Sequence, residues 1–292
     1  MELMTRIDIP EAEWKIGAEA RVLLVGSCFA DEVGQKMAVG GLHAMVNPFG
    51  TLYNPASIAA SLLRSISERE YDGSAAELVR GDADDGVWHS WMHHSRFSSM
   101  NREDLIVKMN QTMHEVADFL RTADVLVVTF GTSIIYRLKE TGMLVANCHK
   151  QPDGMFERTC LTAYDIADQW QMLLQLLESV NPRLKVIFTV SPIRHKRDGY
   201  HTNQVSKGIL LQSADALVQA SSACSYFPAY EIMMDELRDY RFYATDMIHP
   251  SEVAVEYIWQ RFQNTYFDNK TKDAVAKAAK EWRRGQHRTI VR

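Results

Sequence analysis

Short apolar runs alternate along this chain with longer amphipathic segments. The four clearest runs have the length and continuous hydrophobicity of buried parallel strands, and they cover residues 21–26, 124–131, 184–191 and 224–232. A fifth, weaker run lies at 42–47. Pro192 follows the third run and Pro228 interrupts the fourth, so we expect both of these strands to end near their prolines.

Helical periodicity fills the intervals between the runs. Residues 101–121 bring Leu105 and Met109 to one face, and residues 162–180 and 202–220 show the same spacing behind a Thr or Asn that can cap a helix. Strands that alternate with helices predict a doubly wound, mostly parallel sheet of about five strands in a three-layer α/β/α sandwich.

Two segments depart from this alternation. Residues 133–148 form two alternating apolar runs around "KETG", which predicts an inserted β-hairpin. Residues 67–86 are polar and contain glycine, which is typical of a loop or an insertion. Because no repeat or interdomain linker is visible, we expect one domain over residues 1–292. Its end, 269–292, has eight Lys and Arg against two Asp and Glu, which predicts a solvated basic helix and tail.

The composition is that of an ordinary globular protein. Apolar residues make up 46% of the 292 residues, and the net charge of −5 argues against a chain-wide basic surface for nucleic acid. No run approaches the roughly 18 apolar residues of a membrane span, so we expect no membrane partner. The start lacks a signal-peptide pattern and the four cysteines are scattered, so we expect reduced thiols and a cytoplasmic location.

The candidate chemistry follows the predicted strands. In open α/β sheets, ligands bind outside the carboxyl ends of the strands. Ser27 and Cys28, two potential nucleophiles, come directly after the first run, and Asn47 and Gly50 come at or after the 42–47 run. Ser133 follows the run at 124–131.

The sharpest local pattern is Asp246-x-x-His249, which precedes Pro250 and a helical run. A tight turn there can bring the carboxylate to the imidazole Nδ1–H, which fixes the tautomer and leaves Nε2 as a general base. We expect Pro250 to lie in the first helical turn. The turn at 26–28 would supply a nucleophile at a helix N-terminus, where a developing anion is favoured.

The motif "GSCFA" (Gly26–Ala30) resembles the motif that gives the GSCFA family its name. The segments "NPFGTLYNP", "NCHKQP", "SPIRHKRDG" and "DMIHPS" fit the same resemblance, which therefore covers most of the chain. That family is grouped with the SGNH/GDSL hydrolases, which are α/β/α esterases and acyl hydrolases.

The resemblance implies roles for several positions. SGNH enzymes carry a Gly-Asp-Ser nucleophile block, oxyanion donors from a later glycine and a Gly-x-Asn, and a final Asp-x-x-His. Asp246 and His249 match the final block directly, and Gly50 resembles the second-block glycine. Ser133 stands where the Asn of Gly-x-Asn belongs, so the missing amide would have to come from Asn47 or Asn147.

The first block leaves the nucleophile open. Alignment on Gly26 puts Cys28 at the nucleophile position, whereas a shift by one selects Ser27 but puts Val25 in the glycine position. This favours Cys28, whose thiol would have a lowered pKa at a helix N-terminus beside an imidazole. In the alternative, Cys28 is a small buried apolar residue and Ser27 caps the helix.

Other polar clusters have two interpretations each. Cys148 and His149 could face a cleft, but no C-x-x-C or H-x-x-x-H spacing supports a zinc site, and we expect neither a metal nor another cofactor. Arg194, with His195 and Lys196, could bind a substrate carboxylate or phosphate, or form a surface cluster. The aromatic and histidine-rich stretch 87–97 could line a substrate cleft or cap the sheet.

The sequence therefore predicts an SGNH-like hydrolase, an esterase, acyl hydrolase or acyltransferase, that uses Cys28 or Ser27 with His249 and Asp246. Its substrate would be an acyl or acetyl ester of a small molecule or glycan. The alternative is a non-catalytic protein on the same scaffold that binds a small molecule or carbohydrate. The oligomeric state stays open.

Overall fold

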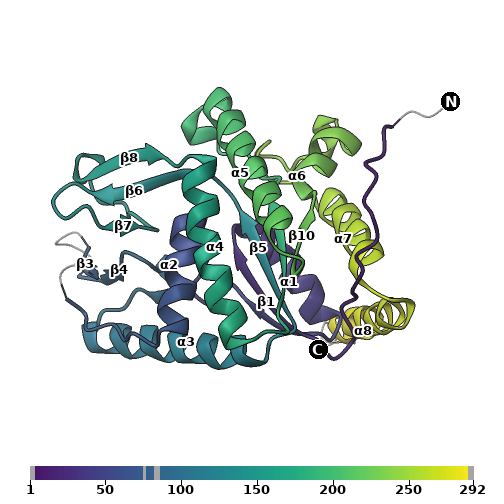
Figure 1. Cartoon of the computed structure of the whole chain (residues 1–292), viewed down its shortest axis with the longest axis horizontal. Helices are drawn as coiled ribbons and strands as arrows, with labels where there is room; N and C mark the ends of the chain where they lie inside the picture. Colours follow the sequence, from purple (N-terminus) through teal and green to yellow (C-terminus); the bar gives the residue numbers. More distant parts are fainter. Residues whose placement is uncertain (1–3, 75–76, 82–85, 289–292) are drawn as a thin grey trace.

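The computed structural model describes residues 4–74, 77–81 and 86–288 of the chain. Five parallel strands form the central sheet in the order β10-β9-β5-β1-β2 (Figure 1). Their bounds are Arg21–Gly26 (β1), His43–Val46 (β2), Val125–Phe130 (β5), Lys185–Val190 (β9) and Cys224–Phe227 (β10). All five predicted strands are confirmed. The last is shorter than its apolar run, because it ends directly before Pro228.

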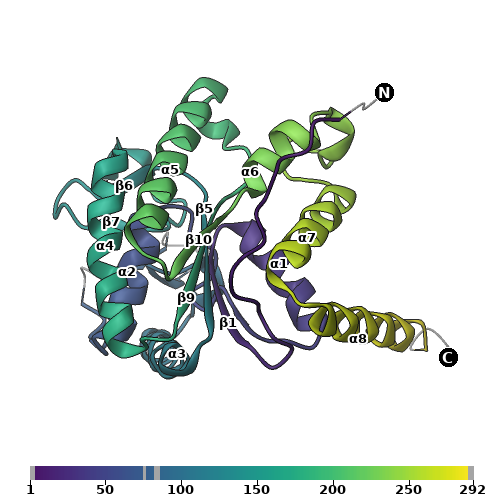
Figure 2. The ribbon, with the colours of Figure 1, turned by 45° about the vertical axis from the view of Figure 1, so that its right-hand side comes forward.

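Alternate side chains of the strands enter two hydrophobic cores, one on each face of the sheet. Leu23 and Val25 pack with helices α2 to α5, and Val22 and Leu24 pack with α1, α7 and α8 (Figure 2). The α-helices of the described residues are α1 Cys28–Val39, α2 Pro55–Ile66, α3 Arg102–Thr122, α4 Ala163–Val180, α5 Tyr200–Ala220, the short α6 Ala229–Glu231, α7 Glu252–Tyr266 and α8 Asn269–Arg288. The predicted three-layer arrangement is confirmed.

The helix starts follow side-chain caps. Asn101 and Thr162 accept backbone N–H groups of the first turns of α3 and α4. Ser251 caps α7, so Pro250 lies before that helix, in a β-bridge with Tyr243. The expectation that Pro250 lies in the first helical turn was wrong, because the serine hydroxyl takes over the capping.

Two small antiparallel sheets extend from the sandwich. β6 (Ile134–Leu138) and β7 (Leu144–Val145) form the predicted hairpin, and β8 (Phe156–Cys160) pairs with the other edge of β6. β3 (Leu78–Arg80) pairs with β4 (Trp88–Ser90), so the segment expected to be a loop or insertion contains a strand.

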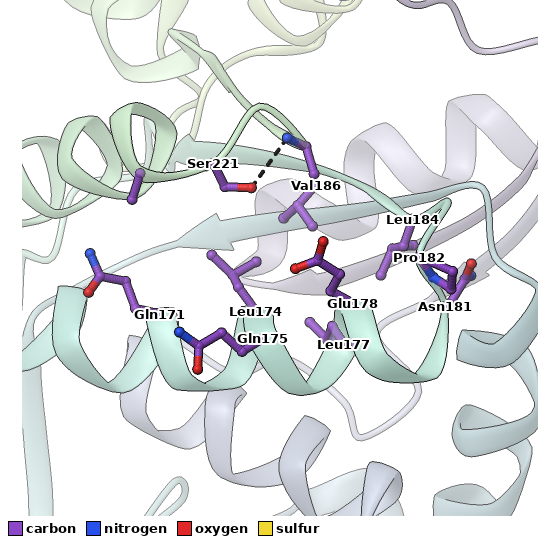
Figure 3. A pocket seen from close by; sticks show the side chains of 12 residues that line it. Gln171, Leu174, Gln175, Leu177, Glu178, Asn181, Pro182, Leu184, Val186 and Ser221 are labelled. Atoms are coloured by element: carbon purple, nitrogen blue, oxygen red, sulfur yellow. Dashed lines mark hydrogen bonds between the residues drawn. The ribbon is translucent and has the colours of Figure 1, made fainter.

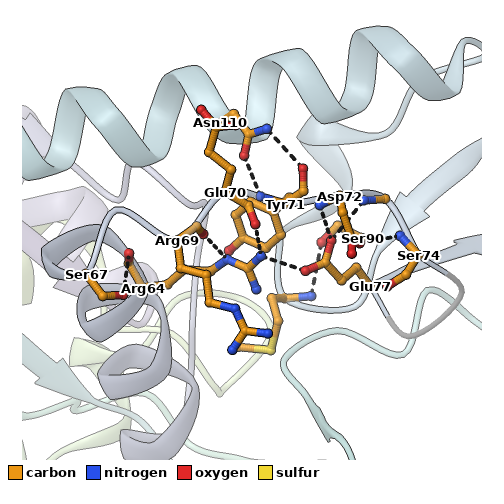
Figure 4. Close-up of polar contacts among 12 residues, drawn as sticks. Arg64, Ser67, Arg69, Glu70, Tyr71, Asp72, Ser74, Glu77, Ser90 and Asn110 are labelled. Atoms are coloured by element: carbon orange, nitrogen blue, oxygen red, sulfur yellow. Dashed lines mark hydrogen bonds and ion pairs between the residues drawn. The ribbon is translucent and has the colours of Figure 1, made fainter.

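Arg64 of α2 ties the insertion, at its described residues 67–74 and Glu77, to the sandwich (Figure 4). Its guanidinium lies 3.6 Å from the centroid of the Tyr71 ring and donates to Glu77 at 2.6 Å and to the Glu70 carbonyl. Asn110 of α3 pairs with both backbone groups of Tyr71. These contacts hold the insertion against α2 and α3.

Helix α8 covers residues 269–288 of the segment expected to form a basic helix and tail, and residues 289–292 lie outside the described residues. Val275 packs against the end of α1, where a side chain on Gly40 would meet it. The rest of α8 extends away from the sheet (Figure 2). No helix in the described ranges combines the length and apolar character that crossing a membrane requires. The single-domain organisation stays a prediction.

Candidate active site

The strand order identifies where a ligand would bind. The chain runs from β1 outward to β2 on one side and to β5, β9 and β10 on the other, so the direction reverses between β1 and β5. In such sheets the carboxyl ends of these two strands open a crevice for ligands. Ser27 and Cys28 follow β1, and Gly131 follows β5.

The turn after β1 requires a glycine. Gly26 has φ 134°, and a Cβ on it would overlap the Thr129 carbonyl of β5. Its N–H donates to the Asn47 side-chain oxygen at 2.8 Å. The carboxyl ends of β1, β2 and β5 are therefore held closely together at this point.

The two candidate nucleophiles have different environments. Ser27 is 2% exposed, and its hydroxyl accepts the Phe29 N–H at 3.3 Å as the cap of α1. Cys28 begins α1 and is partly exposed, with Sγ 3.5 Å from the Tyr53 hydroxyl. Of the two candidate nucleophiles, Cys28 is therefore the more accessible.

The Cys28 thiol is not activated in this structure. Burial raises its pKa, and the Asp31 carboxylate raises it further, against a smaller lowering by the Tyr53 hydrogen bond. The expected lowering was wrong, because desolvation of the thiolate outweighs the helix N-terminus. Burial also raises the pKa of Tyr53, so both groups are protonated at neutral pH.

Asp246 and His249 form the predicted pair. Asp246 Oδ2 lies 2.6 Å from His249 Nδ1, and its other oxygen accepts the backbone N–H groups of Ile248 and His249 at 2.8 and 3.0 Å. The His249 N–H and imidazole, with the Ile248 N–H, lower the pKa of Asp246 to about 2. The carboxylate is thus ionised and favours the Nδ1–H tautomer of His249.

The loop that carries this pair packs on the loop after β9. The Arg194 N–H donates to the Ile248 carbonyl, and Arg194 Nη1 donates to the Met247 carbonyl, both at 3.2 Å. The His249 side chain is 47% exposed. Within residues 4–74, 77–81 and 86–288, no hydrogen bond joins it to Cys28 or Ser27.

His195 joins the site from the same loop. Its ring meets Tyr53 edge-on with centroids 5.7 Å apart, and its backbone N–H donates to the Asn203 side chain at 2.9 Å. Nε2 is buried without a partner among the described residues. Burial, and next the charge of Lys207, lowers the pKa of His195 to about 4, so the ring is neutral at pH 7.

Lys207 of α5 links the carboxyl ends of β5 and β9. The side chain is buried, and Nζ donates to the carbonyls of Gly131 and Ser191 at 2.8 and 2.6 Å, directly after β5 and β9. Desolvation lowers its pKa to about 7. Sequence reasoning missed both Lys207 and Tyr53. Helical spacing from Asn203 through Lys207 to Leu210 was the available signal for the lysine.

Gly50 and Asn47 share a tight turn. Gly50 has φ 82°, its N–H donates to the Asn47 carbonyl at 2.7 Å, and a Cβ would overlap the His94 side chain. The Gly50 N–H is therefore already bonded, which argues against its expected oxyanion role. Asn47 Nδ2, by contrast, is buried with no partner among the described residues.

The remaining candidates have structural partners. Ser133 is fully buried, with its hydroxyl 3.0 Å from that of Ser206 and 3.1 Å from Cys160 Sγ. Asn147 accepts the His149 N–H at 3.0 Å, and the His149 ring bonds the Ser90 carbonyl at 2.7 Å. These two residues follow β7, and the His149 ring lies against β4 of the neighbouring small sheet. Burial lowers the pKa of His149 to about 4.

A hollow of about 400 Å³ lies at the opposite end of the sheet (Figure 3). It runs between α4 and the starts of β9 and β10, past Leu174, Glu178 and Val186. None of the candidate site residues lines it. In the described part of the chain, no three His, Cys, Asp or Glu side chains converge as metal ligands.

Comparison with known proteins gives one family and distant structural likenesses. The model of the GSCFA family matches residues 21–262. No curated protein matches the sequence. A carbohydrate esterase family 3 structure from Talaromyces cellulolyticus has 10% identity and a TM-score of 0.40, over 83% of this chain and 94% of that one. A carbohydrate esterase family 2 enzyme from Corynascus thermopiles (Myceliophthora fergusii) has 12% identity and a TM-score of 0.42, over 92% and 68%.

Proposed function

Because the chain belongs to the GSCFA family, we propose that it is an ester hydrolase with a cysteine nucleophile. Its substrate is an acyl or acetyl ester of a small molecule or glycan. The observation that carries the proposal is the 2.6 Å hydrogen bond between Asp246 and His249, which directs the free Nε2 to act as a base. Cys28, which begins α1 shortly after the end of β1, is the more exposed of the two candidate nucleophiles.

Each group has a defined task in this mechanism. His249 Nε2 takes the thiol proton as Cys28 Sγ attacks the ester carbonyl carbon. Asp246 stabilises the imidazolium that results. The imidazolium then gives its proton to the leaving alcohol, and water hydrolyses the thioester with His249 again as the base.

The raised pKa of Cys28 makes the thiol the resting form, so its proton has to leave during the attack. The loop 243–250 has to bring Nε2 to the sulfur, since catalytic hydrogen bonds often form only in the substrate complex. The Tyr53 hydroxyl stays protonated and holds the sulfur at the start of α1.

Two donors suit the oxyanion. The Cys28 N–H lies in the first turn of α1, where N–H groups have no helical acceptor. Asn47 Nδ2 is a buried donor without a partner in the described ranges, and its side-chain oxygen is fixed by Gly26. Asn47 would take the task of the asparagine that Ser133 replaces.

Hydrolysis of short p-nitrophenyl esters tests the proposal in the wild type and in Cys28→Ala, Ser27→Ala and His249→Ala. We expect kcat/KM to fall by at least about 100-fold in the Cys28 and His249 variants. Ser27→Ala should lose only cap stability, of about 1 kcal/mol. His43→Ala, at an exposed histidine of β2, is the matched control.

Trapping gives an independent check. Brief mixing with an acetyl ester, acid quenching and peptide mass spectrometry should find one acetyl group on Cys28. Full activity in Cys28→Ala would overturn the cysteine mechanism, and activity that instead disappears with Ser27→Ala would transfer the role to the serine.

The second candidate is a binding protein without catalysis. The Gly50 N–H that is already bonded and the unactivated Cys28 thiol favour it. No turnover of any ester, together with binding of a ligand that survives Cys28→Ala, would support this function.

A further inference from the structure

A pocket of about 210 Å³ adjoins the loop that carries His249. Met233, Met234 and Leu237 give it apolar walls, and Tyr230, Tyr243 and Arg194 also line it. Met233 and Met234 lie in a π-helical turn, Ile232–Glu236, and Leu237 comes directly after it; such turns are frequent at functional sites. Thioether side chains adapt to an apolar guest and make favourable contacts with aromatic rings.

Two residues of the pocket wall, Arg194 and Tyr243, contact the loop that carries Asp246 and His249. Arg194 donates to the carbonyls of Met247 and Ile248, inside the Asp246-x-x-His249 loop. Tyr243 forms a β-bridge with Pro250 on the other side of that loop. A substrate group held in the pocket would therefore contact the two residues, Arg194 and Tyr243, that pack against the loop of His249.

Arg194 supplies a positive charge without an ionic partner. Its guanidinium lies 4.4 Å from the Tyr200 ring centroid and 5.4 Å from that of Tyr243. None of the ion pairs among the described residues includes Arg194. Asp239, the acidic residue that lines the same pocket, is engaged by the backbone N–H and guanidinium of Arg241, at 2.9 and 3.6 Å.

These features define the group that fits. The methionines, Leu237 and the tyrosine rings favour an apolar body with a ring-like face. A guanidinium that contacts two aromatic rings, and that forms no ion pair within the described part of the chain, favours a carboxylate. The volume suits one ring or a short branched chain and is too small for an oligosaccharide.

We propose that this pocket is the specificity site for an ester substrate whose alcohol half is a ring-sized apolar group bearing a carboxylate, which Arg194 binds. The proposal rests on the proposed hydrolase function for its substrate class. Binding of the carboxylate itself does not depend on catalysis, so the two can be tested apart.

The kinetic test compares 4-acetoxybenzoate with its neutral methyl ester, which carries the same acetyl group. We expect the wild type to prefer the carboxylate by at least about tenfold in kcat/KM, as a charged hydrogen bond allows. Arg194→Gln should bring the ratio near one, and Arg194→Lys should restore part of it. The ratio cancels any general damage to the His249 loop from the lost Met247 bond.

Arg197→Gln is the matched control, because Arg197 is exposed on the same loop and pairs with Asp153 at 3.1 Å. Its ratio should equal that of the wild type. A wild-type ratio near one, or a ratio that Arg194→Gln leaves unchanged, overturns the proposal even if both esters are hydrolysed.

Binding of 4-hydroxybenzoate, measured by calorimetry on the Cys28→Ala protein, separates the two hypotheses. We expect binding that is at least about tenfold weaker when Arg194→Gln is added, and equally weakened when Met234→Trp fills the pocket. Such binding without hydrolysis of any ester would uphold the carboxylate pocket and reject the hydrolase. Hydrolysis without binding, and with equal rates for the two esters, would reject the pocket alone.

Discussion

Replacing Lys207 by methionine should change how the stability of this protein depends on pH. Lys207 is buried and forms no ion pair with any carboxylate in the described ranges, and its Nζ donates to two backbone carbonyls directly after β5 and β9. Burial disfavours the ammonium form. The folded protein therefore releases this proton near neutral pH, whereas the unfolded chain keeps it.

The size of the effect follows from the two pKa values. Desolvation lowers the pKa of Lys207 from 10.5 to about 7 in the folded state. Between these values the unfolded chain binds more protons, so the free energy of unfolding rises with pH, at up to about 1.36 kcal/mol per unit. Lys207 therefore adds roughly 2 kcal/mol to the free energy of unfolding between about pH 7 and about pH 9. Below the folded pKa both states bind the proton, and the contribution no longer changes with pH.

Methionine abolishes this gain, because it does not titrate. The absolute stability of Lys207→Met is a poorer readout, because two effects oppose each other. The variant no longer has to bury an amine, which stabilises it, but the carbonyls of Gly131 and Ser191 lose their hydrogen-bond donor, which costs about 1–3 kcal/mol each. The difference in pH dependence isolates the lysine. Cysteine thiols with raised pKa values titrate in the same range, but they are common to both proteins.

Urea unfolding followed by tryptophan fluorescence at three pH values measures the difference. From about pH 7 to about pH 9, the free energy of unfolding of the wild type should rise by roughly 2 kcal/mol more than that of Lys207→Met. Lys277→Met, at an exposed lysine of α8, should follow the wild type. Parallel stability curves for the wild type and Lys207→Met would refute a depressed pKa at this position.

Three further outcomes are expected. Gly26→Ala should lower the free energy of unfolding by at least about 2 kcal/mol in urea, because its Cβ would overlap the Thr129 carbonyl at φ 134°; a smaller loss would mean that the turn relaxes. Cys28 should react with iodoacetamide more slowly at neutral pH than a free cysteine, because burial raises its pKa; faster labelling would contradict this. Arg64→Ala should expose the backbone near Tyr71 to proteases in limited digestion, because the ring and Glu77 lose their clamp; an unchanged digestion pattern would show that Asn110 suffices.

The strands of the central sheet were predictable because each is buried on both faces and is therefore apolar throughout. β8 gave no such signal. Of its five residues only Phe156 is buried, so its sequence shows no clear alternation of apolar and polar residues. The π-helical turn after Pro228 was missed for a different reason. Its apolar residues continue the run of β10, and periodicity cannot separate a buried strand from a short buried helix.

The site was predictable only where its chemistry is local. Asp246 and His249 are three residues apart, so a turn alone brings them together. Tyr53 and Cys28 come from different strand ends, and their contact depends on the way the 47–54 turn folds over β1. The N–H of Gly50 donates to the Asn47 carbonyl within that same turn, and no residue spacing in the sequence predicts this hydrogen bond.

Burial also decides which of the neighbouring groups can move a proton. His195 lies close to Tyr53, but burial lowers its pKa to about 4, so it is a weak base at neutral pH. Lys207 is buried, and its Nζ donates to two backbone carbonyls. His249 differs from both, because it is exposed and its Nδ1 side is held by a carboxylate whose pKa is about 2. Burial thus lowers the pKa of two basic side chains and leaves His249 exposed, which is why the proposed mechanism assigns the Cys28 proton to His249.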